Sequence, residues 1–314
     1  MKKRRSQIQL TNAIIYSLKN TLFPFFCIFA ALIFNGMEIF ETKSDLVQIL
    51  NGYRGSGKAI GFVPTMGALH CGHLSLVDLC RRENDVTVVS IFVNPTQFNN
   101  QSDLVNYPRT LEADLDQLKL AKCDFVFVPP VTEMYPEKDT RVFDFGKLDK
   151  VMEGVHRPGH FNGVAQVVSK LFDVVQPVRA YFGEKDFQQL AIIRRLVTMT
   201  NDRVQIVGCP IIREDDGLAM SSRNMRLTPE QRQNAPVIAR TLFACKEKIA
   251  TMPLDELKKW AAAQIDHTPG LQTEYFDIVD RQTLQTAAQY RENALQGCIA
   301  VHAGAIRLID NISL

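Results

Sequence analysis

The 314-residue chain lacks the patterns by which several common kinds of functional site are identified. Its seven cysteines are odd in number and form no C-x-x-C pair, which favours reduced thiols over disulfides or a zinc ribbon. It has no H-E-x-x-H zinc motif, no complete G-x-x-x-x-G-K-[ST] phosphate loop and no G-x-G-x-x-G fingerprint. The segment GYRGSGK, Gly52 to Lys58, precedes a predicted strand and is interpreted as a surface turn.

Charge of one sign is also scarce. The net charge is +2, and no long run of like charge follows the basic residues at the start of the chain. Nucleic acid is therefore not expected as the main partner. No acidic or cysteine nucleophile is placed for covalent catalysis, and we find no repeats.

Residues 1–36 differ in composition from the rest of the chain. A basic head, MKKRR, precedes an apolar run from Leu22 to Phe34. That run is shorter than the roughly 20 residues that span a bilayer, and no convincing A-x-A cleavage site follows it. Three interpretations stay open: a membrane-associated leader, a buried extra helix, or a gene-start artefact with translation from Met37. We favour the artefact.

From residue 59 onwards, short apolar segments alternate with amphipathic ones. Strands are predicted at 59–65, 85–94, 124–130, 178–183 and 204–213. Helices are predicted at 72–84, 110–123, 161–177 and 185–201. Strands separated by crossover helices predict an α/β fold with a Rossmann-like parallel sheet, in a domain of residues 37–211.

The pattern changes after residue 211. One long helix is predicted to start at the Thr228-Pro229 cap, and a second at 253–265. Strands are predicted at 274–280, 297–304 and 305–314. These elements predict a smaller α+β lid domain of residues 212–314.

The segment PTMGALHCGH, Pro64 to His73, lies where the first predicted strand meets the first helix. His70 and His73 are three residues apart, so they share a face at the helix N-terminus, where N–H groups and the helix dipole favour anions. Gly67 and Gly72 allow close backbone approach to a ligand. Phosphate recognition is the favoured interpretation; a metal pair or purely structural histidines are the alternatives.

Two further segments carry groups suited to phosphate. In YFGEKDFQQL, Lys185 can reach a phosphate, Asp186 can cap a helix or hold a ribose hydroxyl or Mg²⁺, and Gln189 can bind substrate. In DGLAMSSRNMRLT, residues 216–228, the hydroxyls and Arg223 can grip phosphates as a lid closes. A solvated turn and a Ser-rich linker are the respective alternatives.

Two segments point to a small hydroxylated acid as substrate. IFVNPTQF leaves a predicted buried strand and presents Asn94 and Gln97, whose neutral amides suit such a ligand. VMEGVHRPGHFNGVAQVV places Arg157 and His160 near a Gly-rich loop. Together the five segments indicate nucleotide binding and transfer of a nucleotidyl group.

PTMGALHCGH, SIFVNPTQF, RPGHFNGV, YFGEKDFQQL and DGLAMSSRN occur in the order seen in the pantothenate synthetases, the pantoate–β-alanine ligases. The resemblance runs from Met37 to the C-terminus. It implies that ATP and pantoate form pantoyl adenylate and pyrophosphate with Mg²⁺, and that β-alanine then displaces AMP. It also implies a homodimer. Because ATP and pantoate are cytosolic, it further implies a cytoplasmic protein without membrane association.

The resemblance also assigns site residues. The catalytic residues are His73, as the presumed acid/base group, with His70 and Lys185. The ATP-binding residues are Met66, Gly67, Ala68, Leu69, His70, Cys71, Gly72, His73, Gly183, Glu184, Lys185, Asp186, Ile212, Met220, Ser221, Ser222 and Arg223. The substrate-binding residues are Gln97, Gln189, Asn94, Arg157 and His160. The metal ligands are left unknown, with Asp114 and Asp186 as candidates.

Two departures from the family pattern leave these assignments intact: Cys71 between the histidines, where an acidic residue is common, and Val178 after Gln-Pro, where Asp is frequent. Two rival functions remain: another HxGH adenylyltransferase, such as one acting on phosphopantetheine, and a non-catalytic nucleotide-binding protein.

Overall fold

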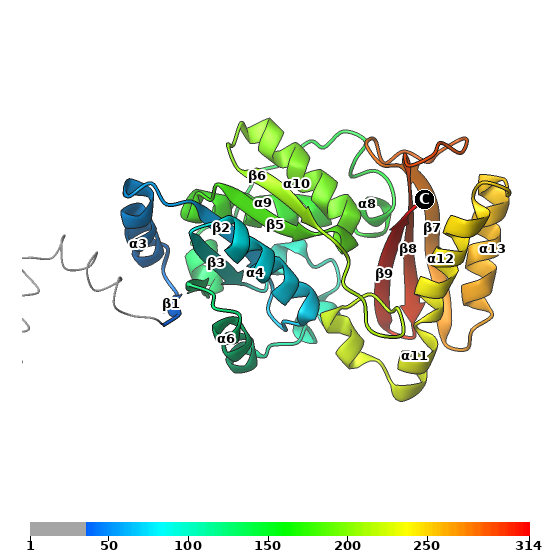
Figure 1. Cartoon of the computed structure of the whole chain (residues 1–314), viewed down its shortest axis with the longest axis horizontal. Coiled ribbons are helices and arrows are strands. Elements are labelled where there is room, and N and C mark those ends of the chain that lie inside the picture. Colours follow the sequence, from blue (N-terminus) through cyan, green and yellow to red (C-terminus); the bar gives the residue numbers. More distant parts are fainter. Residues whose placement is uncertain (1–35) are drawn as a thin grey trace, which may run out of the picture. The chain divides into compact units, whose positions relative to one another are not determined.

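The computed structural model describes residues 36–314, so the interpretations of the N-terminal leader concern residues almost entirely outside the described part (Figure 1). Residues Glu38–Leu314 form one compact unit. Among the residues that the structure describes, no helix is long and apolar enough to cross a membrane.

Six parallel strands form the main sheet in the order β1-β4-β3-β2-β5-β6. The strands are β1 (Glu38–Phe40), β2 (Ile60–Thr65), β3 (Val86–Ile91), β4 (Phe125–Phe127), β5 (Arg179–Gly183) and β6 (Gln205–Cys209). The predicted Rossmann-like α/β fold is confirmed. β1 was not predicted, because a three-residue strand at the sheet edge has too few residues to show a period.

Helices connect these strands. They are α3 (Lys43–Gly55), α4 (Cys71–Glu83), α5 (Gln101–Val105), α6 (Leu111–Leu120), α7 (Val131–Met134), α8 (Glu153–His156), α9 (His160–Val175) and α10 (Phe187–Thr200), with the 3₁₀ turns η1 (Pro95–Gln97) and η2 (Glu184–Asp186). The predicted surface turn at GYRGSGK is only partly right, since Gly52–Gly55 complete α3.

Alternate strand residues separate the two faces of the sheet. Phe62, Val88 and Phe182 pack in one core cluster with residues of α3, α9 and α10. Tyr181 points the other way and donates its hydroxyl hydrogen to Glu83 at the end of α4 (2.8 Å). This period of two, in strands buried on both faces, is what a doubly wound parallel sheet requires.

The strand order reverses direction beside β2. From β2 the chain proceeds outward through β3 and β4, then returns across the sheet to β5 and β6. Ligands of open α/β sheets bind at such a switch point, beyond the carboxyl ends of the strands. The segments following β2 and β5 therefore lie where a ligand site is expected.

The C-terminal part forms an antiparallel sheet of three strands, covered by helices (Figure 1). Its elements are η3 (Ser222–Arg226), α11 (Pro229–Asn234), α12 (Val237–Lys248), α13 (Leu254–Asp266), β7 (Leu271–Asp280), β8 (Leu295–Ala303) and β9 (Ile306–Ser313). The single long helix predicted after Thr228 is wrong, because it is divided at Ala235-Pro236, where proline cannot donate the backbone hydrogen bond.

Candidate active site

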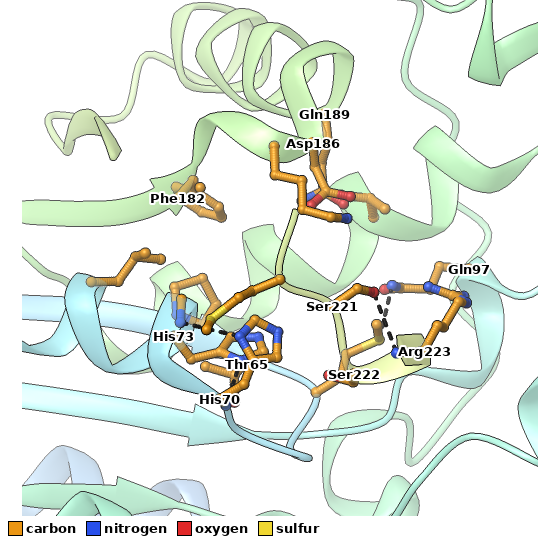
Figure 2. Close-up of a pocket in the computed structure, with 18 of the residues that line it drawn as sticks. Thr65, His70, His73, Gln97, Phe182, Asp186, Gln189, Ser221, Ser222 and Arg223 are labelled. Carbon is orange, nitrogen blue, oxygen red and sulfur yellow. Dashed lines mark hydrogen bonds between the residues drawn. The ribbon is translucent and has the colours of Figure 1, made fainter. Parts of the chain in front are cut away.

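A cavity of about 220 Å³ opens at the switch point of the parallel sheet. The end of β2, the start of α4, the turn after β5 and residues 210–223 all contribute to its wall. Figure 2 shows His70 and His73 on one side of it, with Asp186 and Gln189 on another. His73, Lys185 and Ser222, which come from three distant segments, thus line one cavity.

The loop between β2 and α4 has a strained backbone that Asp114 supports. Gly67 and Ala68 both have positive φ angles, of 79° and 49°, and the second is unusual for a residue with a side chain. The buried carboxylate of Asp114 accepts hydrogen bonds from the N–H groups of Ala68 (2.9 Å) and Leu69 (2.8 Å). Asp114 therefore holds the loop in this conformation.

The two histidines cap α4 with their side chains. Nδ1 of His70 accepts from the N–H of Gly72 (3.2 Å), and Nδ1 of His73 accepts from the N–H of His70 (3.3 Å). An accepting Nδ1 places the ring hydrogen of a neutral imidazole on Nε2. Burial and the nearby Lys185 lower the pKa of His70 to about 4.

His73 is perturbed in the same direction. Burial, His70 and Lys185 together lower the pKa of His73 to about 3. The two ring centroids are 4.1 Å apart, so a charge on one ring would disfavour a charge on the other. At neutral pH both imidazoles are therefore uncharged hydrogen-bond donors through Nε2.

The turn after β5 is held by the C-terminal sheet. The buried side-chain amide of Asn311 on β9 donates to the carbonyl oxygens of Glu184 (3.0 Å) and Lys185 (2.8 Å). Asp310 beside it forms a bidentate ion pair with Arg213 (2.6 and 3.0 Å). Strand β9 thereby sets the position of the turn from which Lys185 and Asp186 reach the cavity.

Asn94 and His160 orient the segment that carries Gln97. Asn94 Nδ2 donates to Gln97 Oε1 and to the carbonyl of Gly163, both at 3.1 Å, and its Oδ1 accepts from Tyr135 (2.8 Å). His160 Nδ1 bonds to the carbonyl of Gln97 (2.8 Å). A Cβ on Gly163 would lie 2.4 Å from the carbonyl oxygen of Thr96, so only glycine allows this approach.

The Ser-Ser-Arg segment lies against the loop after β2. Ser222 Oγ donates to the carbonyl of Ala68 (2.9 Å), and Ser221 caps η3 by accepting from the N–H of Arg223 (3.3 Å). Arg223 donates to Asp103 on α5 (2.8 Å), which also accepts from Arg226 (3.1 Å). Arg223 therefore lines the cavity while paired with a carboxylate.

Most of the site residues expected from the sequence line this cavity. They are Met66, His70, Gly72, His73, Asn94, Gln97, Gly183, Lys185, Asp186, Gln189, Ile212, Met220, Ser221, Ser222 and Arg223. The other expected residues, Gly67, Ala68, Leu69, Cys71, Glu184, Arg157 and His160, are not part of its lining, and the last two line a smaller chamber nearby.

Sequence reasoning missed the apolar part of the wall. It comprises Pro64, Leu76, Phe92, Val164, Val167, Val168, Leu171, Phe182, Pro210 and Ile211, with Thr65 and Tyr107 as polar additions. The four residues from α9 recur at helical spacing, a pattern that the hydrophobic core produces equally well. The spacing alone could not distinguish a cavity wall from packing.

The two candidate metal ligands have different surroundings. Asp114 accepts hydrogen bonds from the N–H groups of Ala68 and Leu69 and from the hydroxyl of Thr110, and it is not part of the cavity lining. Asp186 lines the cavity. Within residues 36–314, no group of three or more His, Cys, Asp or Glu side chains could hold a metal by itself.

Known proteins with the same organisation identify the family. The Pantoate-beta-alanine ligase family model matches residues 38–313. The Pantothenate synthetase of Bacteroides thetaiotaomicron is 55% identical over 277 residues, which are 88% of this chain and 98% of that protein.

Solved structures agree with this. Pantothenate synthetase from Thermus thermophilus has a TM-score of 0.83 and 44% identity, over 88% of this chain and 99% of its own. Pantoate-beta-alanine ligase from Francisella tularensis has a TM-score of 0.75 and 36% identity, over 88% and 97% of the two chains. This chain, with its histidine pair at the switch point of the sheet, therefore belongs to the pantoate–β-alanine ligase family.

Proposed function

We propose that this protein joins pantoate to β-alanine at the expense of ATP, through a pantoyl-adenylate intermediate. The observation that carries the proposal is the convergence of His70, His73, Lys185 and Ser222 on one cavity at the switch point. The Francisella tularensis relative was solved with a β,γ-ATP compound and β-alanine, which supports both as ligands.

In the first step, a carboxylate oxygen of pantoate attacks the α-phosphorus of ATP, and pyrophosphate leaves. The uncharged Nε2–H groups of His70 and His73 donate hydrogen bonds to the phosphate oxygens as negative charge develops there, and the ammonium of Lys185 offsets part of that charge. Because the pKa of His73 is lowered to about 3, His73 acts as a neutral donor in this proposal, rather than as the acid/base group that the family resemblance implies.

Pantoate lies between Gln97 and Gln189, whose amides suit its carboxylate and hydroxyls. Asn94 positions Gln97 and does not bind substrate through its NH₂ group, because Asn94 Nδ2 already donates to Gln97 Oε1 and to the carbonyl oxygen of Gly163. ATP lies along Met66–His73, Gly183–Asp186, Ile212 and Met220–Arg223. Arg223 lines the cavity while its Nη2 donates to Asp103, so its other N–H groups are the ones offered to a phosphate.

Magnesium fits this site as a partner of the ATP phosphates. Asp186 is the carboxylate in the cavity lining, and it would hold the ion together with phosphate oxygens, as Mg²⁺ sites commonly do. When bound, the ion neutralises phosphate charge and orients the triphosphate.

In the second step, the uncharged amine of β-alanine attacks the acyl carbon of the adenylate. The C–N bond forms, the bond from the acyl carbon to the phosphate oxygen breaks, AMP leaves, and the nitrogen loses a proton to give the amide. The adenylate would hydrolyse in bulk water. We therefore propose that residues 212–314 act as a lid domain on the 37–211 domain and shield the adenylate.

A cytoplasmic location and a homodimeric state are also part of the proposal.

The test of this function is AMP release. AMP should form from ATP at a high rate only when pantoate and β-alanine are both present, with one pantothenate per AMP. AMP that appears only with a different acceptor would contradict the ligase assignment. Pyrophosphate exchange that requires phosphopantetheine in place of pantoate would favour the rival adenylyltransferase.

Adenylate formation should be insensitive to pH around the ordinary histidine pKa of 6.5, because both pocket histidines stay neutral down to about pH 4. Pantoate-dependent ATP–pyrophosphate exchange, measured from pH 8 to about pH 5, tests this. A loss of rate with a midpoint near 6.5 that disappears in His73→Gln would contradict it.

The free energy of unfolding, unlike the rate of adenylate formation, should decrease as the pH falls below about 6.5. A histidine whose folded-state pKa is lowered binds protons more readily in the unfolded chain, so acid favours unfolding. For His70 and His73 the stability is complete above about pH 6.5 and is lost progressively as the pH falls towards their folded values of about 4 and 3. Urea unfolding at pH 7 and pH 5 measures this loss.

A further inference from the structure

A chain of hydrogen bonds connects the end of α7 to the cavity wall. The hydroxyl of Tyr135, the residue after α7, lies 2.8 Å from Asn94 Oδ1, and Asn94 Nδ2 lies 3.1 Å from Gln97 Oε1. Asn94 and Gln97 line the cavity, with Gln97 labelled in Figure 2, whereas Tyr135 lies outside the lining. We call these three residues the amide relay. Tyr135 can influence a ligand in the cavity only through the other two.

The direction of each hydrogen bond in the relay follows from backbone groups at Asn94. The carbonyl oxygen of Gly163 can only accept, so the end of the Asn94 amide that faces it at 3.1 Å is the NH₂ group. The backbone N–H of Thr96 can only donate, and it faces Asn94 Oδ1 at 3.4 Å. The same NH₂ group faces Gln97, which therefore accepts through Oε1. The NH₂ group of Gln97 is thus directed to Met66, a residue of the cavity lining.

Tyr135 contributes the shortest hydrogen bond to Asn94 Oδ1. Its oxygen is 2.8 Å away, compared with 3.1 Å for Thr96 Oγ1 and 3.4 Å for Thr96 N. Burial raises the pKa of Tyr135, so the phenol keeps its hydrogen at neutral pH and acts as the donor. The ring packs beside Phe92, with centroids 6.3 Å apart, and Lys170 Nζ lies 5.3 Å from the ring centre. Packing therefore fixes the position of this donor.

The last donor of the relay has only a weak acceptor in the protein. Gln97 Nε2 donates to the thioether sulfur of Met66 (3.1 Å), and such a sulfur accepts hydrogen bonds weakly. A carboxylate oxygen of a ligand would form a stronger, charge-assisted bond with the same group. Because the side chain of Gln97 is buried and already oriented, little rotamer entropy is lost when that bond forms.

We propose that Tyr135 is a positioning residue for the acid substrate: through Asn94, its hydroxyl holds the Gln97 amide so that an N–H donor, and not the amide oxygen, faces the acceptor oxygens of pantoate. This proposal rests on the proposed ligase function and concerns its first step. A reversed amide would place Gln97 Oε1 against a carboxylate oxygen, and two acceptors repel each other. The relay therefore favours an acid over a ligand that presents only donors.

The experiment replaces Tyr135 with phenylalanine in the full-length protein, which removes only the hydroxyl. In pantoate-dependent ATP–pyrophosphate exchange, the KM for pantoate should rise about 5–10-fold, as expected for the loss of one neutral hydrogen bond. The kcat and the KM for ATP should stay within about twofold, because the relay supports binding of the acid alone. An unchanged KM for pantoate, or an equal loss in kcat and in the KM for ATP, would overturn the proposal.

Tyr181→Phe is the matched control. This substitution also removes a hydroxyl that donates at 2.8 Å, here to Glu83, on the opposite face of the sheet from the core cluster of Phe62 and Phe182. The Tyr181 hydroxyl also accepts from Asn84 (2.7 Å), so this variant should lose at least as much stability towards urea as Tyr135→Phe. Its KM for pantoate should nevertheless stay within about twofold of that of the unsubstituted protein. A similar rise in both variants would show a general effect of destabilisation and contradict a positioning role.

A double-variant cycle tests whether Tyr135 acts through Gln97. In a protein that already carries Gln97→Ala, adding Tyr135→Phe should change pantoate affinity by less than about twofold. Titration calorimetry with pantoate gives this affinity without turnover, so a slow Gln97→Ala variant can still be compared. The same loss in both backgrounds would overturn the proposal while leaving the ligase function intact. Absence of pantoate-dependent exchange in the unsubstituted protein would instead overturn the ligase function, and this proposal with it.

Discussion

Replacing His73 with alanine should slow pantoyl-adenylate formation about 10²–10³-fold, the usual cost of removing one preorganised donor to developing charge. The substitution removes the Nε2–H donor, and it also removes the acceptor for the N–H of His70. The loss of that capping bond should lower the free energy of unfolding by only about 1 kcal/mol. The rate should therefore fall far more than the stability.

His73→Gln distinguishes a donor from an acid. Glutamine keeps a neutral N–H group but cannot exchange a proton, so it should recover about tenfold of the lost rate if His73 acts as a donor. Rapid-quench measurement of pantoyl adenylate, with urea unfolding of each variant, provides both readouts. Near-normal adenylate formation in His73→Ala would refute any direct role of this residue.

Replacing Arg307 with alanine should destabilise the fold by about 3–5 kcal/mol, because it leaves the buried carboxylate of Glu153 without its main partner. Burial alone would raise the pKa of Glu153, but the hydrogen bonds and charge of Arg307 outweigh it and lower the pKa to about 2. This pair joins α8 to β9, segments 154 residues apart in the chain.

The pH dependence of this loss has a definite sign. A carboxylate with a lowered folded-state pKa stabilises the fold above its ordinary value of 4.5, and that stability disappears as the pH falls towards 2. Urea unfolding should therefore show the largest difference between Arg307→Ala and the unsubstituted protein near neutral pH. Glu153→Gln and the double variant complete the cycle, and an additive result would show that the two side chains do not interact.

Local patterns were sufficient to predict most of the parallel sheet. Buried strands such as β3 are continuous apolar runs, and α9 shows a helical period, so their type follows from short-range sequence. Motif order then indicated which loops hold the ligand, and the cavity contains most of those residues. The prediction of one long helix is wrong at Pro236, because it gave the helical pattern more weight than the proline that separates α11 from α12.

Partners of buried charges were not predictable in the same way. Asp114 resembled a metal ligand in sequence, but it supports the loop at Ala68 and Leu69 from 46 and 45 residues away. Arg223 carried the expected charge, but its pairing with Asp103 depends on α5 lying beside η3. Such contacts have no fixed spacing along the chain, so neither a periodic pattern nor a motif predicts them.

By itself, the sequence determined five of the six strands of the parallel sheet, the helices α4, α6, α9 and α10, the segments that meet at the carboxyl edge and the family to which they belong. These depend on the periodicity of neighbouring residues and on short motifs with fixed spacing. Only the tertiary structure decided the neutral state of His70 and His73, the supporting role of Asp114 and the pairing of Glu153 with Arg307. Protonation and charge pairing depend on burial and on side chains brought together from distant segments, which become defined only when the chain folds.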